Sequence, residues 1–195
     1  MIDISTYPIL SSHMATLKDT SLDKRDDRTI VYMTESTKLV VNFDKVKEEY
    51  VKPLKLCEVP KSNDALMTDE KSKLIFIEFK NGYMDRAKQF AVRKKIYDSV
   101  LILSDIVSLG ISDMRTFVDY ILVYNEEVNE KNPDVIKERK THIQPSASFN
   151  NFAKGVSNLA KEEYVCFGMK QFENYCFKKV HTYTEKEFEK YILSF

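Results

Sequence analysis

The pattern of apolar and polar residues is most distinctive between residues 64 and 82. A short apolar run at residues 65–67 is followed by a polar, turn-like stretch and then by the apolar run Leu74-Ile75-Phe76-Ile77. The second run continues as Glu-Phe-Lys and ends at an Asn-Gly pair, which is a strong turn signal. This pattern predicts a hairpin whose second strand is buried on both faces, as is typical of central strands in sheets covered by helices.

Helical spacing flanks the predicted hairpin on both sides. In residues 43–54 the apolar positions recur every three or four residues, with Asn42 as a candidate cap and Pro53 as the expected end or bend. Residues 84–109 predict a long helix that Gly110 would terminate.

The second half of the chain gives weaker signals. Residues 117–124 predict another buried strand, and residues 125–148 form a charged excursion with two prolines. A helix at 149–162 and a strand at 164–168 are further expectations. Thr184 begins a capping box, with Glu187 three residues later, and predicts a last helix.

Together these elements predict an α/β fold, with α+β as the alternative, in a single domain. The expected core is a central mixed sheet of about four or more strands flanked by helices. The chain divides into a peripheral arm at 1–41, a core at 42–125 and an accessory tail at 126–195 packed on that core. The arm is polar, contains the charge run DKRDDR, and is expected to be loose or to form a peripheral hairpin.

Composition narrows the function classes. The 195 residues suit one domain, and 30 basic residues balance 30 acidic ones, so no overall field attracts a polyanion. Bulk electrostatic binding to nucleic acid is therefore not expected, although a local basic face is compatible with this balance. The first residues lack the pattern of a secretory signal, and no apolar run is long enough to span a membrane. We expect a cytoplasmic protein with no membrane partner and with reduced cysteines.

Several common catalytic motifs are missing from the sequence. Four glycines supply neither a dinucleotide-binding fingerprint nor a phosphate-binding Walker loop, and there is no G-x-S-x-G, H-E-x-x-H or paired C-x-x-C. A cysteine-dependent enzyme that uses Cys166 or Cys176, with His181 five residues after the latter, stays as a weak alternative.

One group of acidic and basic residues is suited to catalysis. Side chains alternate along a strand, so Glu78 and Lys80 share a face at the end of the predicted buried strand. Asp64 begins the other strand of the hairpin and is expected beside them. Two carboxylates and a backbone carbonyl suit a hard divalent cation, and a lysine can orient a water or neutralise charge on a reacting phosphate. The pattern predicts metal-assisted phosphodiester hydrolysis, whereas the structural alternative is a salt-bridged cluster at a sheet end.

Asp64, Glu78-Phe79-Lys80, the long helix and the next strand resemble the PD-(D/E)xK, or restriction-endonuclease-like, nuclease superfamily over roughly residues 42–125. The resemblance implies a core of about four mixed strands flanked by helices, with Mg²⁺ or Mn²⁺ as the cofactor. It makes Asp64 and Glu78 metal ligands and Lys80 the catalytic lysine.

The same resemblance implies further site residues. Many members place a glutamine on the helix after the Glu-x-Lys strand, and Gln89 matches that role. A supporting glutamate on the first helix is common, and Glu48 and Glu49 are equal candidates. The chain departs from the family pattern because Asn63, not proline, directly precedes Asp64.

A basic stretch offers a weak nucleic-acid contact. Residues 85–95 contain five basic residues against one aspartate, a local balance of 5 − 1 = +4, and Arg86, Arg93, Lys94 and Lys95 are the candidate phosphate contacts. The alternative is an ordinary solvated helix face.

Two function hypotheses from different classes follow. The first is a metal-dependent nuclease that acts on DNA or RNA. A homodimer is compatible with this hypothesis, because many such nucleases pair to cut two strands. The second is a non-catalytic interaction or regulatory protein on a nuclease-like fold, for example a phage-defence or mobile-element component. Convergence of Asp64, Glu78 and Lys80 on one open pocket favours the enzyme, whereas a side chain that fills the pocket favours the interaction protein.

Overall fold

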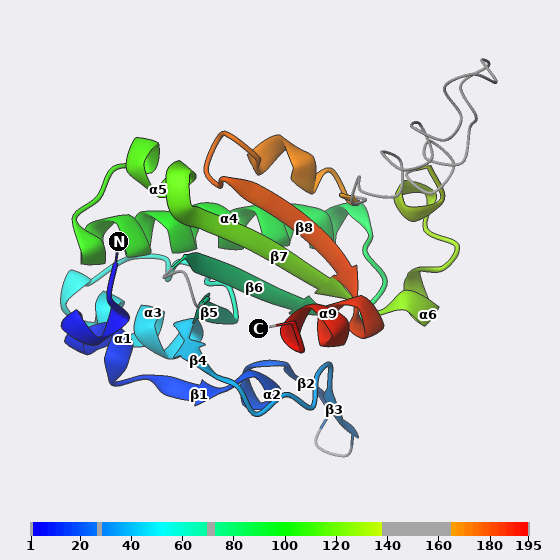
Figure 1. Cartoon of the computed structure of the whole chain (residues 1–195), viewed down its shortest axis with the longest axis horizontal. Coiled ribbons are helices and arrows are strands. Elements are labelled where there is room, and N and C mark those ends of the chain that lie inside the picture. Colours follow the sequence, from blue (N-terminus) through cyan, green and yellow to red (C-terminus); the bar gives the residue numbers. More distant parts are fainter. Residues whose placement is uncertain (1, 27–28, 70–72, 138–164, 195) are drawn as a thin grey trace.

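The computed structural model describes residues 2–26, 29–69, 73–137 and 165–194. Its core is a six-stranded mixed sheet in the order β1-β4-β5-β6-β7-β8, covered by helices (Figure 1). The strands are β1 (Met14–Thr16), β4 (Leu39–Asn42), β5 (Ala65–Thr68), β6 (Leu74–Lys80), β7 (Val118–Tyr124) and β8 (Lys179–Thr184). The predicted mixed sheet flanked by helices is confirmed.

The helices of the described chain are short except for one. They are α1 (Pro8–Ser11), α2 (Leu17–Thr20), α3 (Phe43–Val51), α4 (Arg86–Val107), α5 (Ile111–Phe117), α6 (Glu126–Asn129) and α9 (Glu185–Ile192), with 3-10 turns η1 (Ile4–Thr6), η2 (Lys52–Leu54) and η4 (Met169–Phe172). None of these helices is long and apolar enough to cross a membrane.

The sheet changes from antiparallel to parallel pairing at β6. Strand β5 pairs with β6 in antiparallel fashion, with Ala65 opposite Ile77, whereas β6 with β7 and β7 with β8 are parallel. The crossover from β6 to β7 requires a long connection, which α4 and α5 supply. Strand β6 is buried along its whole length up to Phe79, as the two-sided apolar run predicts.

Two apolar layers hold the sheet between helices. Leu74 and Phe76 of β6 pack with α3 and α4 on one face, while Ile75, Ile77 and Phe79 pack with Phe188 of α9 on the other. Figure 1 shows α4 crossing behind β6 to β8 and α9 on the near side. Glu78 alternates with Ile77 and Phe79, so it lies on the face that α4 covers.

Several local predictions are confirmed. The Asn42 side chain caps α3 by accepting from the Lys45 amide, and α3 gives way at Lys52 to a 3-10 turn that contains Pro53. Thr184 and Glu187 form the expected capping box of α9.

Other local predictions are wrong. Gly110 does not end the long helix: α4 ends at Val107 with Ser108 in the left-handed conformation, and Gly110 is the residue before α5. Residues 165–168 form a turn rather than a strand, and the edge strand β8 lies further along, at Lys179–Thr184. The helix expected at 149–162 lies outside the described residues.

The first 41 residues belong more closely to the sheet than a peripheral arm would. They supply β1 and most of β4, and the buried Leu17, Val40 and Val41 join the two apolar layers. A hairpin of β2 (Leu22–Asp26) and β3 (Thr29–Tyr32) does form, as a separate two-stranded sheet. The tail likewise contributes β8 to the central sheet.

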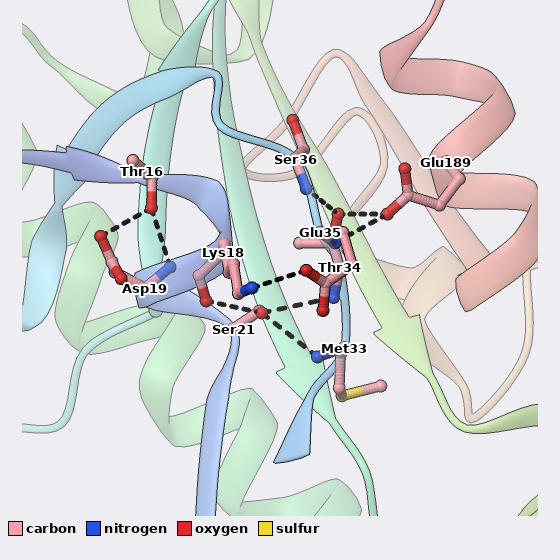
Figure 2. Close-up of polar contacts among 9 residues, drawn as sticks. All are labelled: Thr16, Lys18, Asp19, Ser21, Met33, Thr34, Glu35, Ser36 and Glu189. Carbon is pink, nitrogen blue, oxygen red and sulfur yellow. Dashed lines mark hydrogen bonds and ion pairs between the residues drawn. The ribbon is translucent and has the colours of Figure 1, made fainter. Parts of the chain in front are cut away.

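Polar contacts fix the hairpin to the body of the protein (Figure 2). The Ser21 hydroxyl accepts from the Met33 and Thr34 amides, at 3.2 and 3.3 Å, and so joins the two ends of the hairpin. Thr34 donates its hydroxyl proton to Glu189 of α9, and the same carboxylate accepts from the Glu35 amide. The C-terminal helix therefore holds the N-terminal hairpin in place.

Candidate active site

The candidate site begins with the register of the β5–β6 hairpin. Ala65 lies opposite Ile77, so the next step of the antiparallel ladder places Asp64 opposite Glu78 on one face of the sheet. The Asp64 carboxylate accepts a hydrogen bond from the Phe79 amide at 2.7 Å and so continues the ladder beyond the end of β5. The expected approach of the two carboxylates is therefore present.

Two lysines neutralise the pair of carboxylates. Lys95 of α4 donates to Asp64 Oδ1 at 2.9 Å and to Glu78 Oε1 at 2.7 Å. Lys80 forms an ion pair with the same Glu78 oxygen. The sequence hypothesis that Asp64, Glu78 and Lys80 form one cluster thus agrees with the geometry, and Lys95 is an additional member.

The backbone of Asn63, the residue directly before Asp64, is hydrogen-bonded to α4, the helix that carries Lys95. The Asn63 amide donates to Ser99 Oγ at 2.7 Å, and both residues are buried. Ser99 lies one turn after Lys95 on α4, so the two side chains lie on the same face of the helix. Helix α4 therefore positions both the Asp64 backbone and its carboxylate.

Glu78 is the most deeply buried member, with no exposed surface. Burial and the neighbouring Asp64 raise the pKa of its carboxyl, while Lys80 and Lys95 oppose that rise. Its Oε2 atom has no hydrogen-bond partner among the described residues. A buried carboxylate oxygen without a partner is costly unless it takes up a proton or a cation, so this atom is a fitting metal ligand.

Lys95 owes its charge to the two carboxylates. Burial alone would lower the pKa of its ammonium group, but Glu78 and Asp64 outweigh that effect and raise the pKa. Tyr120 of β7 lies on the same face, and burial together with the charges of Glu78 and Asp64 raises the pKa of its phenol. The Tyr120 hydroxyl also has no hydrogen-bond partner in the described part of the chain.

A cleft of about 990 Å³ opens at the exposed end of this cluster, and Asp64 and Lys80 line it. Its walls come from α2, the hairpin and α3, together with Tyr83, which precedes α4, and Lys88 in the first turn of α4. Asp23 of the hairpin accepts from the Asn81 side chain at 3.0 Å, which fixes this wall to the end of β6.

The charges of the cleft are mixed. Five carboxylates line it against four lysine ammonium groups: Asp19, Asp23, Asp44, Glu48 and Asp64 against Lys45, Lys47, Lys80 and Lys88. A cleft with that balance does not attract a polyanion by itself, and added divalent cations would reverse its sign.

The two candidate glutamates of the first helix have different surroundings in the structure. Glu48 lines the cleft and forms an ion pair with Lys45 at 2.9 Å. Glu49 contacts His13 at 2.7 Å and is not among the residues that line the cleft. Of the two glutamates, Glu48 is therefore the one that lines the cleft.

Gln89 takes no part in the hydrogen bonds of the cluster. Its side-chain amide donates to Asp134 at 2.7 Å and to the Met84 carbonyl at 3.2 Å. Gln89 and Lys95 are six positions apart, or roughly 240° around the helix, so both cannot face the carboxylates. Lys95 faces them, and the position that the resemblance assigns to Gln89 does not.

The four basic residues proposed as phosphate contacts do not form one face. Lys95 lies in the cluster, Lys94 pairs with Glu58 at 3.3 Å and Asp98 at 3.9 Å, and Arg86 is exposed. Arg93 is half-buried, and its guanidinium lies close to Gly168. The predicted basic stripe is thus wrong as a continuous surface, because alternate basic residues project to different sides of α4.

The cysteine alternative finds no support in the geometry. Cys166 and Cys176 are both buried, and burial raises the pKa of the Cys176 thiol. A catalytic cysteine needs the opposite shift and needs access. His181 stacks on Tyr183 and lies 3.9 Å from Asp119.

Lys95 is the site residue that sequence reasoning placed in the wrong role. In the structure, Val92, Ile96 and Ser99 are buried around it on α4. A lysine within a buried helical stripe needs a charged partner, and the carboxylates at the end of β6 were the candidates.

A scan against protein-family models and searches of curated proteins and solved structures each found no match to this chain.

Proposed function

We propose that the chain is a metal-dependent nuclease-like protein that hydrolyses phosphodiester bonds in DNA or RNA. The observation that carries the proposal is the approach of the Asp64 and Glu78 carboxylates at one end of the β5–β6 hairpin, with Lys80 beside them at a cleft. The order α3, β5, β6, α4, β7, antiparallel before β6 and parallel after it, supports a restriction-endonuclease-like core.

Asp64 and Glu78 would hold the divalent cation. Mg²⁺ is commonly bound by one or two carboxylates together with waters and substrate phosphates, so two acidic side chains suffice. The partnerless Glu78 Oε2 and the Asp64 carboxylate at the edge of the cleft fit that role. When bound, such a cation supplies Lewis-acid polarisation of a phosphate and a more acidic bound water.

The remaining residues act by position and charge. Lys80 holds its ammonium on Glu78 and borders the cleft, where it would stabilise negative charge on a reacting phosphate. The Phe79 amide orients Asp64, and the ion pair with Lys45 orients Glu48. Burial of Glu78 excludes water from one side of the cluster and strengthens its electrostatic interactions.

Cleavage assays test the proposal directly. The full chain is incubated with single- and double-stranded DNA and with RNA, in Mg²⁺, in Mn²⁺ and in EDTA, beside Glu78→Gln. The expected result is cleavage of at least one substrate that needs the metal and is lost in Glu78→Gln. Circular dichroism of both proteins checks that the variant keeps the fold.

A specific observation also favours the second hypothesis, a non-catalytic interaction protein. The Lys95 ammonium already lies between Asp64 and Glu78, so the carboxylates are paired within the chain. If no substrate is cut in any metal while the protein is folded, this hypothesis replaces the first.

A further inference from the structure

Helix α4 directs a lysine into the interior of the protein. Val92, Ile96 and Ser99 are fully buried around Lys95, whose own side chain is 20% exposed. Lysine is seldom placed in such a stripe, because burial of an ammonium group is costly without charged partners. Its position therefore reflects the carboxylates that it meets.

The Lys95 ammonium occupies the space between the two candidate metal ligands. It lies 2.9 Å from Asp64 Oδ1 and 2.7 Å from Glu78 Oε1, so one cation bridges both carboxylates. Together with Lys80 the cluster holds two positive and two negative charges. The addition of a divalent cation would leave an excess of two positive charges in a mostly buried site.

That balance makes Lys95 and a metal ion competitors. Both need the same carboxylate oxygens, and repulsion at this short range is strong where water is excluded. The side chain of Lys95 has four flexible carbon–carbon bonds, and Asp64, its partner, lines the cleft. A phosphate group in the cleft would offer the displaced ammonium a new negative partner.

We infer that the Lys95 ammonium group fills the metal position in the free protein. When a substrate phosphate attracts this ammonium group, Lys95 leaves the position and the metal ion takes it. The metal site is then closed until substrate arrives, which limits binding of free divalent cations. This inference rests on the proposed function and adds a mode of regulation to the same site.

The test compares Mn²⁺ binding by titration calorimetry in the full chain, without nucleic acid. Lys95→Met removes the competing charge and keeps a similar length, and Lys94→Met is the matched control from the adjacent position. We expect Lys95→Met to bind Mn²⁺ at least about tenfold more tightly than the wild type, the size of a typical coupling between two sites. Lys94→Met should bind like the wild type.

The outcomes separate the inference from the proposed function. Equal or weaker Mn²⁺ binding in Lys95→Met, with binding lost in Asp64→Asn, would overturn the inference and leave the metal site in place. Absence of Mn²⁺ binding in every protein, Lys95→Met included, both alone and with a phosphorothioate oligonucleotide, would remove the metal site and the proposed function together.

A second measurement on the wild type avoids dependence on the variant's folding. An amine-reactive probe followed by mass spectrometry compares labelling of Lys95 with that of Lys94. Labelling of Lys95 should rise in Mn²⁺ at a concentration that saturates the wild type without oligonucleotide, because no phosphate then pairs with the released amine, while that of Lys94 stays constant. Unchanged labelling of Lys95 under those conditions would show that the ammonium is not displaced.

Discussion

Asp64, directly before β5, and Glu78 of β6 meet at one end of the hairpin, where the ammonium group of Lys95 bridges their carboxylates. This relationship joins three segments of the chain, since the residues come from just before β5, the end of β6 and the middle of α4. It also places a fully buried glutamate beside Asp64 and Lys80, which line the cleft.

Lys80 is expected to matter for turnover. It holds its ammonium group on Glu78 at the border of the cleft, so Lys80→Met should lower the cleavage rate by about 10²–10⁴-fold, the range for loss of a group that acts in proton transfer or charge stabilisation. Rates are measured with saturating Mn²⁺. Lys88→Met, another lysine of the cleft, is the control and should retain most of the activity. Equal losses in the two variants would contradict a specific role for Lys80.

Gln89 is expected to be dispensable for cleavage. Its amide bonds Asp134 and the Met84 carbonyl, so Gln89→Ala should lower the free energy of unfolding by about 0.5–1.5 kcal/mol and leave the cleavage rate near that of the wild type. Urea denaturation and a rate assay below the unfolding range measure the two effects. A rate loss as large as that of Lys80→Met would show that Gln89 does contribute to cleavage, as the resemblance implies.

As the pH is lowered, metal binding is expected to weaken at a higher pH than it would if Glu78 were an exposed glutamate. Burial and Asp64 raise the pKa of Glu78 above its usual 4.5, and Lys80 and Lys95 only partly oppose that shift. A metal binds the deprotonated carboxylate, so affinity is full above the raised pKa and falls as the pH drops through it. Calorimetric Mn²⁺ titrations at successive pH values measure the effect. Constant affinity down to pH 4.5 would contradict the raised pKa.

The contact between Thr34 and Glu189 is expected to stabilise the hairpin that walls the cleft (Figure 2). Thr34→Val keeps the shape of the side chain but removes the bond to Glu189 and the bond accepted from the Ser36 amide, at a cost of about 1–3 kcal/mol in the free energy of unfolding. Hydrogen exchange of the amides at Met33 and Glu35 should also become faster. Thr116→Val, which loses only a local bond on the surface of α5, is the control. Similar losses in both variants would argue against a special role for the contact.

The sequence predicted the β5–β6 hairpin and its two carboxylates because their signals are local. An apolar run, a turn and the alternation of side chains together determine that Glu78 and Asp64 approach each other. The capping residues Asn42 and Thr184 were predictable for the same reason, since a cap acts within one turn of helix.

The side chain that α4 turns toward the two carboxylates could not be predicted in the same way. Which of Gln89, Arg93 and Lys95 faces the site depends on the helix face that packs on the sheet, and apolar residues are spread around much of this helix. Strands β1 and β4 were missed because they span only three and four residues, too few for a reliable alternation. Their place in the sheet depends on pairing with distant segments.

The most direct test of the central claim is a calorimetric titration of Mn²⁺ into the full chain and into Asp64→Asn/Glu78→Gln. Each protein is titrated with and without a phosphorothioate oligonucleotide, because Mg²⁺-type sites often need substrate phosphates. The account predicts binding to the wild type that strengthens with the oligonucleotide and is lost in the double variant. Equal binding in the two proteins, or none by the wild type in either condition, would contradict it.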